Sequence, residues 1–204
     1  MTVRVGVLAL QGGFALHAAA FHDLGAVAEE VRRPAALDTL DALVLPGGES
    51  TTLLNLMGDE PWFDALRAFA DRGGAMLGTC AGAILLAREV RGPSQPSLGL
   101  LDAVVARNAW GRQVDSFEAD VLLAGDPSPM PAVFIRAPRF LELGAGAVSL
   151  ATLDGEVVAA RQGRILAATF HPELTQDRRL HGLLLETVVE QAGPAHAVAG
   201  RARC

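Results

Sequence analysis

Short apolar runs alternate with amphipathic segments along the first hundred residues. The apolar runs are rich in β-branched and aliphatic side chains, which is typical of strands covered on both faces. They lie at 3–10, 26–31, 42–48 and 75–79. The intervening segments have helical spacing and lie at 14–25, 49–58, 61–74 and 81–89. Strands and helices that alternate in this way predict a parallel, doubly wound α/β sheet, a three-layer fold of flavodoxin-like type.

Glycine, proline and hydroxyl residues mark the ends of these predicted helices. Gly25 and Gly73 are typical of helix C-termini, and Pro61 suits the first turn of a helix. Ser50 or Thr51 is expected to cap the helix that follows the third strand, because a side-chain oxygen there can accept a free backbone N–H.

The pattern changes after the Pro/Gly/Ser-rich loop at 91–99. Short strand candidates now follow one another with little helix between them, at 100–108, 116–123, 132–138, 148–153, 156–163 and 164–170. We expect them to extend the main sheet and to add partly antiparallel strands, with an amphipathic helix at 177–192 closing the fold. Residues 1–192 are expected to form a single domain, and the small, polar and basic tail 193–204 to be disordered.

Composition narrows the possible function classes. Half of the 204 residues are hydrophobic, so a packed core is expected, and the formal net charge of −6 gives no electrostatic support for binding nucleic acid. Neither a signal peptide nor an apolar run of membrane-spanning length is recognisable. With Cys80 and Cys204 as its only cysteines, the chain is expected to work in a reducing cytoplasm.

Cys80 lies in the sequence Gly78-Thr79-Cys80-Ala81-Gly82, at a predicted turn from strand to helix. This is the spacing of a nucleophile elbow, with cysteine where α/β-hydrolases have serine. Glycines on both sides allow a tight, strained turn, and the N-terminus of the next helix favours a thiolate. The N–H of Ala81 could also bind an oxyanion. The alternative, a small buried cysteine that only packs, does not explain the flanking glycines.

His171 is the best candidate for the base that a thiol nucleophile needs. It ends an apolar strand and is followed by Pro172 and Glu173. In an extended segment the side chains of residues 171 and 173 would point the same way, so the carboxylate could orient the imidazole. The four other histidines lie on predicted helices or in the tail, where ordinary surface or packing roles are more common.

A Pro-Gly-Gly turn follows the third predicted strand. Ligands bind at the carboxyl edge of open α/β sheets, and glycines there expose backbone N–H groups. Gly48 is therefore a candidate second oxyanion donor, beside Ala81.

Together these motifs resemble the class I, or triad, glutamine amidotransferases. The segments LPGGEST, GTCAGAILLA, RNAWGRQ, VFIRAP and ATFHPEL make the chain similar, within that class, to the glutaminase subunits of bacterial pyridoxal 5′-phosphate synthase. The resemblance runs from about Val3 to Val189. It implies hydrolysis of L-glutamine to glutamate and ammonia, with the ammonia passing to a separate synthase subunit that makes pyridoxal 5′-phosphate. No metal or cofactor is expected in the subunit itself.

The resemblance also implies roles for individual residues. Cys80 would be the nucleophile, His171 the base and Glu173 its orienting partner. Gln11 would belong to a loop at the site or at the partner face. Glutamine would be held by Gly48, Glu49, Ser50, Arg107, Ile135 and Arg136. The two arginines suit this role because a guanidinium binds a free carboxylate with paired hydrogen bonds.

Two other functions remain open at this point. The chain could serve a different synthase, such as imidazole glycerol phosphate synthase, although RNAWGRQ and VFIRAP argue against that. It could instead be a non-catalytic thiol sensor with a cysteine elbow, but such a protein would have no use for His171 and Glu173.

Overall fold

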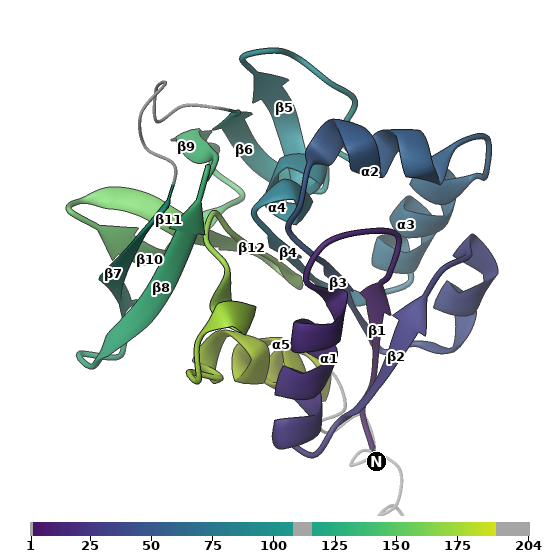
Figure 1. Ribbon diagram of the computed structural model, residues 1–204, viewed down its shortest axis with the longest axis horizontal. Helices are drawn as coiled ribbons and strands as arrows, with labels where there is room; N and C mark the ends of the chain where they lie inside the picture. Colours follow the sequence, from purple (N-terminus) through teal and green to yellow (C-terminus); the bar gives the residue numbers. More distant parts are fainter. Residues whose placement is uncertain (1, 108–115, 191–204) are drawn as a thin grey trace, which may run out of the picture.

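A parallel sheet forms the centre of the molecule (Figure 1). The computed structural model describes residues 2–107 and 116–190. Five strands run parallel, in the spatial order β2 (Val27–Val31), β1 (Arg4–Leu8), β3 (Ala42–Leu45), β4 (Ala75–Thr79) and β12 (Ile165–Ala168). This is the order of a flavodoxin-like sheet. The predicted doubly wound fold is therefore confirmed.

Helices cover both faces of this sheet, because successive strand residues point to opposite sides. Along β3, Val44 packs into one core, and Leu43 and Leu45 pack into the other. The face of Val44 is covered by α1 (Phe14–Asp23) and α5 (Arg179–Val189). The opposite face is covered by η1 (Pro34–Thr39), α2 (Ser50–Met57), α3 (Trp62–Asp71) and α4 (Ala81–Leu86).

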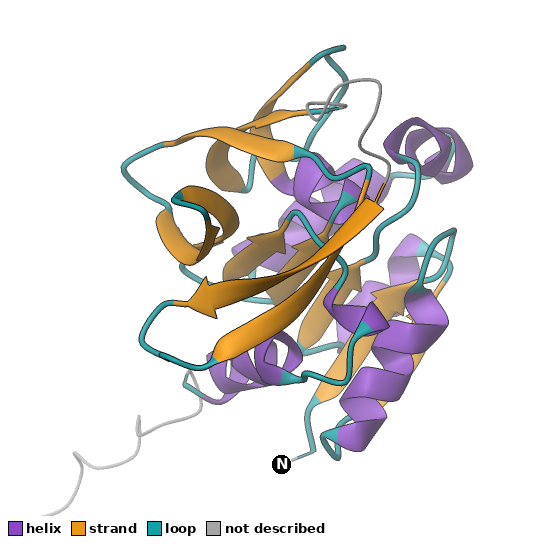
Figure 2. Ribbon diagram, turned by 60° about the vertical axis from the view of Figure 1, so that its left-hand side comes forward, coloured by secondary structure: helices purple, strands orange, loops and turns teal. Residues whose placement is uncertain are grey.

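Antiparallel strands extend the sheet beyond β12, as expected from the second half of the sequence. They are β11 (Glu156–Gln162), β10 (Val148–Leu153), β7 (Ser116–Leu123) and β8 (Pro129–Ile135). Figure 2 is turned so that these strands come to the front. A smaller sheet contains β5 (Ala87–Arg91), β6 (Leu101–Ala106) and β9 (Arg139–Leu143).

Three local predictions were wrong. The helix expected at 81–89 ends at Leu86, because the next residues pair with β6 as strand β5, and these tertiary hydrogen bonds override local helix propensity. Strand β9 was not predicted at all. The N-cap of α2 is Glu49, not Ser50 or Thr51: its carboxylate accepts the N–H of Thr52 at 2.6 Å.

In the described ranges, no helix is long and apolar enough to span a membrane. The single domain over 1–192 stays a prediction, and the predicted tail 193–204 lies outside the described residues.

Candidate active site

Cys80 lies in the turn between β4 and α4, with φ 49° and ψ −102°. A non-glycine residue in this region is strained, and such strain is typical of functional sites. The flanking glycines are needed for packing, since a side chain at Gly82 would meet the Leu45 carbonyl oxygen at 1.9 Å, and one at Gly78 the Gly82 backbone at 2.6 Å. The sulfur is buried: Cys80 is 6% exposed. The geometry is that of the predicted elbow.

His171 Nδ1 donates a hydrogen bond to Glu173 Oε1 at 2.8 Å. The contact agrees with the prediction, but the predicted local conformation was wrong. Strand β12 ends at Ala168, and Pro172–Leu174 form a 3-10 turn, η2, with His171 as its N-cap. The tight turn folds the glutamate back toward the imidazole, so an extended segment is not what brings the two side chains together.

Gly47, two residues after the end of β3, lies against both His171 and Cys80. A side chain at this position would meet His171 Cε1 at 2.3 Å and Cys80 Cβ at 3.2 Å. The backbone after β3, the elbow after β4 and the turn after β12 therefore meet at one point. This is the carboxyl edge of three neighbouring parallel strands, where open α/β sheets bind ligands.

Burial and charge act against each other in this cluster. Burial disfavours a charged His171, but hydrogen bonds and charge interactions with Cys80 and Glu173 outweigh it and raise the His171 pKa to about 10. Burial likewise opposes ionisation of Glu173, yet hydrogen bonds with His17 and His171 hold its pKa well below the usual range. An imidazolium and a carboxylate are thus the favoured states at neutral pH, which suits a neighbouring thiolate.

A cavity of about 460 Å³ opens over the sulfur and the imidazole, a size typical of small-molecule sites. All six residues proposed to hold a substrate line it. Ile84 and Pro138 also line it, and sequence reasoning missed both. Among the residues that the structure describes, the lining consists of Gly48, Glu49, Ser50, Cys80, Ile84, Arg107, Ile135, Arg136, Pro138 and His171. Ala81, the other predicted oxyanion donor, is the first residue of α4 directly behind Cys80 and is fully buried.

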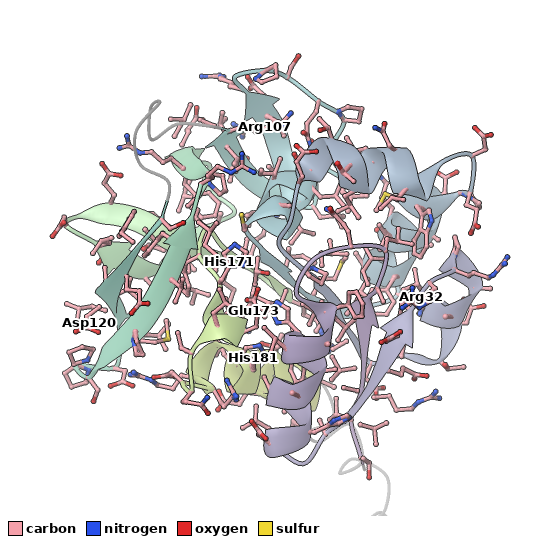
Figure 3. All side chains as sticks on the ribbon, viewed as in Figure 1. Arg32, Arg107, Asp120, His171, Glu173 and His181 are labelled. Atoms are coloured by element: carbon pink, nitrogen blue, oxygen red, sulfur yellow. The ribbon has the colours of Figure 1, made fainter. Side chains whose placement is uncertain are left out.

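The cavity wall opposite the elbow carries the positive charge. The Arg107 side chain is only 10% exposed and pairs with Glu49 at 3.3 Å (Figure 3). The Thr51 hydroxyl and the Thr52 N–H, acting against a small desolvation cost, lower the Glu49 pKa to about 2, so this carboxylate is ionised. Arg136 has a left-handed φ of 42°, and the Ile135 carbonyl oxygen lies 3.9 Å from the Cys80 sulfur.

Gln11 holds the loop that carries Gly48. Its Nε2 donates to the Glu49 carbonyl oxygen at 2.7 Å, and its Oε1 accepts from the Glu49 N–H at 3.4 Å. Gly48 has φ 140°, and a side chain there would meet Gln11 Nε2 at 2.9 Å. Gln11 is not among the lining residues of the cavity, so its contacts place it behind this loop.

His17 and His181 are functional candidates that sequence reasoning set aside. Both are fully buried, and His17 Nε2 lies 3.2 Å from Glu173 Oε2. A signal was present: His17 belongs to the i, i+3, i+4 stripe of α1 that also buries Ala20 and Phe21. A polar residue on an apolar stripe requires a partner.

The sequence model of the SNO glutamine amidotransferase family matches residues 7–190. The chain belongs to this family. Curated members are similar over almost their whole length. "Pyridoxal 5′-phosphate synthase subunit PdxT" of Deinococcus radiodurans is 54% identical over 195 residues, which cover 93% of this chain and 100% of that protein. The protein of the same name from Thermus thermophilus is 53% identical, covering 89% and 96%.

A solved structure described as a glutamine amidotransferase is also similar. It has 51% sequence identity, a TM-score of 0.85, and coverage of 91% of this chain and 98% of its own. The family assignment agrees with the resemblance found in the sequence. Part of one diagnostic segment, RNAWGRQ, lies outside the described residues, so its contribution to the cavity wall stays a prediction.

Proposed function

We propose that this chain is the glutaminase subunit of a pyridoxal 5′-phosphate synthase. It hydrolyses L-glutamine to L-glutamate and ammonia, and the ammonia is used by a separate synthase subunit in vitamin B6 biosynthesis. The observation that carries this proposal is that Cys80 and His171 line one cavity and that Glu173 contacts the His171 ring. Relatives more than 50% identical over 93% and 89% of the chain carry the synthase name, which supports this partner.

Cys80 is the nucleophile in this proposal. Its thiolate attacks the carboxamide carbon of glutamine and forms a tetrahedral intermediate. The N–H groups of Ala81 and Gly48 stabilise the oxyanion, the kind of interaction that contributes most to acyl transfer. His171 gives its proton to the departing nitrogen, ammonia leaves, and a thioester remains.

His171 then acts as a base. It takes a proton from water, which attacks the thioester carbon, and glutamate leaves as the C–S bond breaks. Glu173 keeps the imidazole oriented through both steps, because its Oε1 contacts the ring nitrogen that does not face the sulfur.

The other cavity residues recognise the amino-acid end of glutamine. A guanidinium at Arg107 or Arg136 suits the α-carboxylate, and the ionised Glu49 suits the α-ammonium group. Ser50 contributes to the wall, although its hydroxyl already donates to Gln95 Oε1 at 2.8 Å. A polar cavity with charges of both signs fits a zwitterionic substrate.

The alternatives have less support. Curated relatives named for the pyridoxal 5′-phosphate synthase argue against imidazole glycerol phosphate synthase as the partner system. A thiol sensor needs neither the imidazole nor the glutamate that accompany the cysteine. Because vitamin B6 synthesis supplies cytoplasmic enzymes, and Cys80 must stay reduced to act, we place the protein in the cytoplasm.

The test is glutamate release from L-glutamine by the purified chain, alone and with the synthase subunit of the same organism. We expect slow hydrolysis by the chain alone and a clear rise with the partner, because the flexible Gly47-Gly48 backbone can adopt its catalytic geometry on docking. Equal rates with and without the partner would contradict this activation. No release in either case would contradict the proposed function.

A further inference from the structure

A row of buried polar side chains continues behind Glu173, away from the cavity. Glu173 Oε1 contacts His171, and its Oε2 lies 3.2 Å from His17 Nε2. His17 Nδ1 in turn lies 3.0 Å from His181 Nε2. His171, Glu173 and His181 follow one another along this line in Figure 3. Three separate elements, η2, α1 and α5, thus supply one chain of hydrogen-bonding groups.

The contacts of this row select one arrangement of protons. His17 Nε2 faces two oxygens, Glu173 Oε2 and Thr79 Oγ1, the latter at 3.2 Å, so this nitrogen carries hydrogen. His181 Nδ1 is buried without a partner. A bare lone pair is less costly there than an unpaired N–H, which places the His181 hydrogen on Nε2. His181 Nε2–H therefore donates to His17 Nδ1, and His17 is neutral.

Glu173 needs this second donor. Its side chain is 1% exposed, and a buried carboxylate is stable only when hydrogen bonds replace its water. Oε1 is hydrogen-bonded to His171 Nδ1. Oε2 is buried and, among the described residues, has no partner with good hydrogen-bond geometry, but His17 Nε2 lies 3.2 Å from it and can supply the donor. The N-terminus of α1 adds to this, because a side chain at Gly13 would meet Glu173 Oε1 at 3.0 Å. His17 also contacts the cysteine elbow, because its Nε2 is hydrogen-bonded to Thr79 Oγ1 and Thr79 directly precedes Cys80.

We propose that His17 is a positioning residue of the catalytic apparatus: it holds the Glu173 carboxylate ionised and oriented, and thereby keeps the proton on His171. His181 sets the tautomer of His17. The edge of the Phe21 ring packs against His181 at 5.1 Å between ring centroids and fixes its plane. The inference rests on the proposed function only for its catalytic consequence; the proton arrangement can be tested without any substrate.

Other charged groups act at the two ends of the row. Cys80 faces His171, while Asp177 and Arg178 act on His181 from the start of α5. Arg178 is itself paired with Asp23 at 2.9 Å. Burial lowers the His181 pKa to about 3, in agreement with a neutral His181 ring.

The test uses His17→Leu, which removes both ring nitrogens, and His17→Gln, whose amide can still donate toward Glu173. The matched control is His22→Leu, on the exposed side of the same helix. Long-range ¹H–¹⁵N NMR of the imidazoles reports the tautomers and the pH at which His171 loses its proton. Glutaminase assays with the synthase subunit report kcat and KM.

In the wild-type protein we expect the neutral Nε2–H tautomer at both His17 and His181. In His17→Leu, His171 loses its proton at a pH at least one unit lower, the alkaline limb of kcat moves with it, and kcat falls about 10- to 100-fold with KM nearly unchanged. His17→Gln recovers most of kcat, and His22→Leu behaves as wild type.

Two results would overturn the inference. One is an Nδ1–H tautomer at His17 in the wild-type protein, which needs no variant to fold. The other is a His171 titration in folded His17→Leu that equals the His171 titration in His22→Leu, with KM as the only kinetic constant that changes. Absence of glutamate release by the wild-type complex would instead reject the proposed function and leave the titration result intact.

Discussion

The five parallel strands of the main sheet and the strands added after residue 100 contribute different groups to the cavity. The parallel strands β3, β4 and β12 end in the backbone and side chains proposed for chemistry: Gly47, Cys80 and the His171–Glu173 pair. The strands added after residue 100 end in the arginines proposed for recognition, Arg107 after β6 and Arg136 after β8. The other recognition residues, Glu49 and Ser50, follow β3.

The two parts also differ in packing. Around Cys80 the backbone is so close that two of the surrounding glycines could not carry a side chain, and the residues are buried. Ile135 and Arg136 are exposed on the opposite wall. Nucleophile and base need sub-ångström placement, which a close-packed sheet edge supplies. Recognition of charged groups tolerates more movement and can lie on strand ends and loops.

The largest expected effect is loss of the nucleophile. Cys80→Ser keeps the elbow geometry but lowers glutamate release by at least about 10⁴-fold, because serine has no base strong enough to ionise it here. Rates are measured with the synthase subunit present. Cys204→Ser is the control and keeps wild-type activity. Substantial glutamate release by Cys80→Ser would contradict the proposed role of Cys80 as the nucleophile.

Gly47→Ala tests whether close packing at the parallel edge is required. The added methyl group would meet the His171 ring at 2.3 Å, so the imidazole must move. A displacement of this size is expected to lower kcat about 10²-fold. Gly182→Ala, on α5 with open space around it, is the control and should leave kcat unchanged. Similar kcat values for both variants would contradict the proposed convergence.

Arg107→Leu tests the recognition wall. Removing a guanidinium from the substrate carboxylate is expected to raise KM about 10- to 100-fold while kcat changes little, because such charged hydrogen bonds contribute about 1.5–3 kcal/mol. Steady-state kinetics at saturating glutamine separate the two effects. A fall in kcat with unchanged KM would contradict the proposed role of Arg107 in binding the substrate.

The smallest effect concerns His181, the buried histidine on α5 that contacts His17. His181 is neutral in the folded protein, because its pKa is lowered to about 3. In the unfolded chain its pKa is the ordinary value of about 6.5, so below that pH unfolding takes up a proton. Between pH 6.5 and 4.5 the free energy of unfolding should therefore fall, by up to about 1.4 kcal/mol per pH unit.

Urea denaturation at several pH values measures this slope. The groups with shifted pKa values near the cavity do not interfere: the contribution of His171 is fully present below pH 6.5, and that of Glu173 is lost only below about pH 4.5. His181→Gln should flatten the slope, and His22→Gln should not. An unchanged slope in His181→Gln would show that the row of histidines is hydrated.

Sequence patterns predicted the parallel part of the fold well, because its strands are continuous apolar runs and glycine or proline marks the boundaries of several of its elements. The range 75–79 coincides with β4, and Gly25 follows α1. The same local rules failed at Ala87–Arg91, where pairing with β6 decides the conformation, and at β9, whose half-exposed residues lack a clear alternation. Local propensity is weak where tertiary hydrogen bonds compete with it.

The linear chain by itself determined the elbow at Cys80, the Gly-Gly turn and the presence of a histidine and a glutamate two residues apart, because each of these depends on neighbours along the backbone. Only the tertiary structure decided that η2 turns Glu173 back onto His171, that Gln11 supports the Gly48 loop, and that His17 lies beside the second oxygen of Glu173. Those contacts join residues as far apart in the sequence as His17 and Glu173. No local sequence pattern predicts such long-range contacts, because they arise only when whole helices and strands pack together.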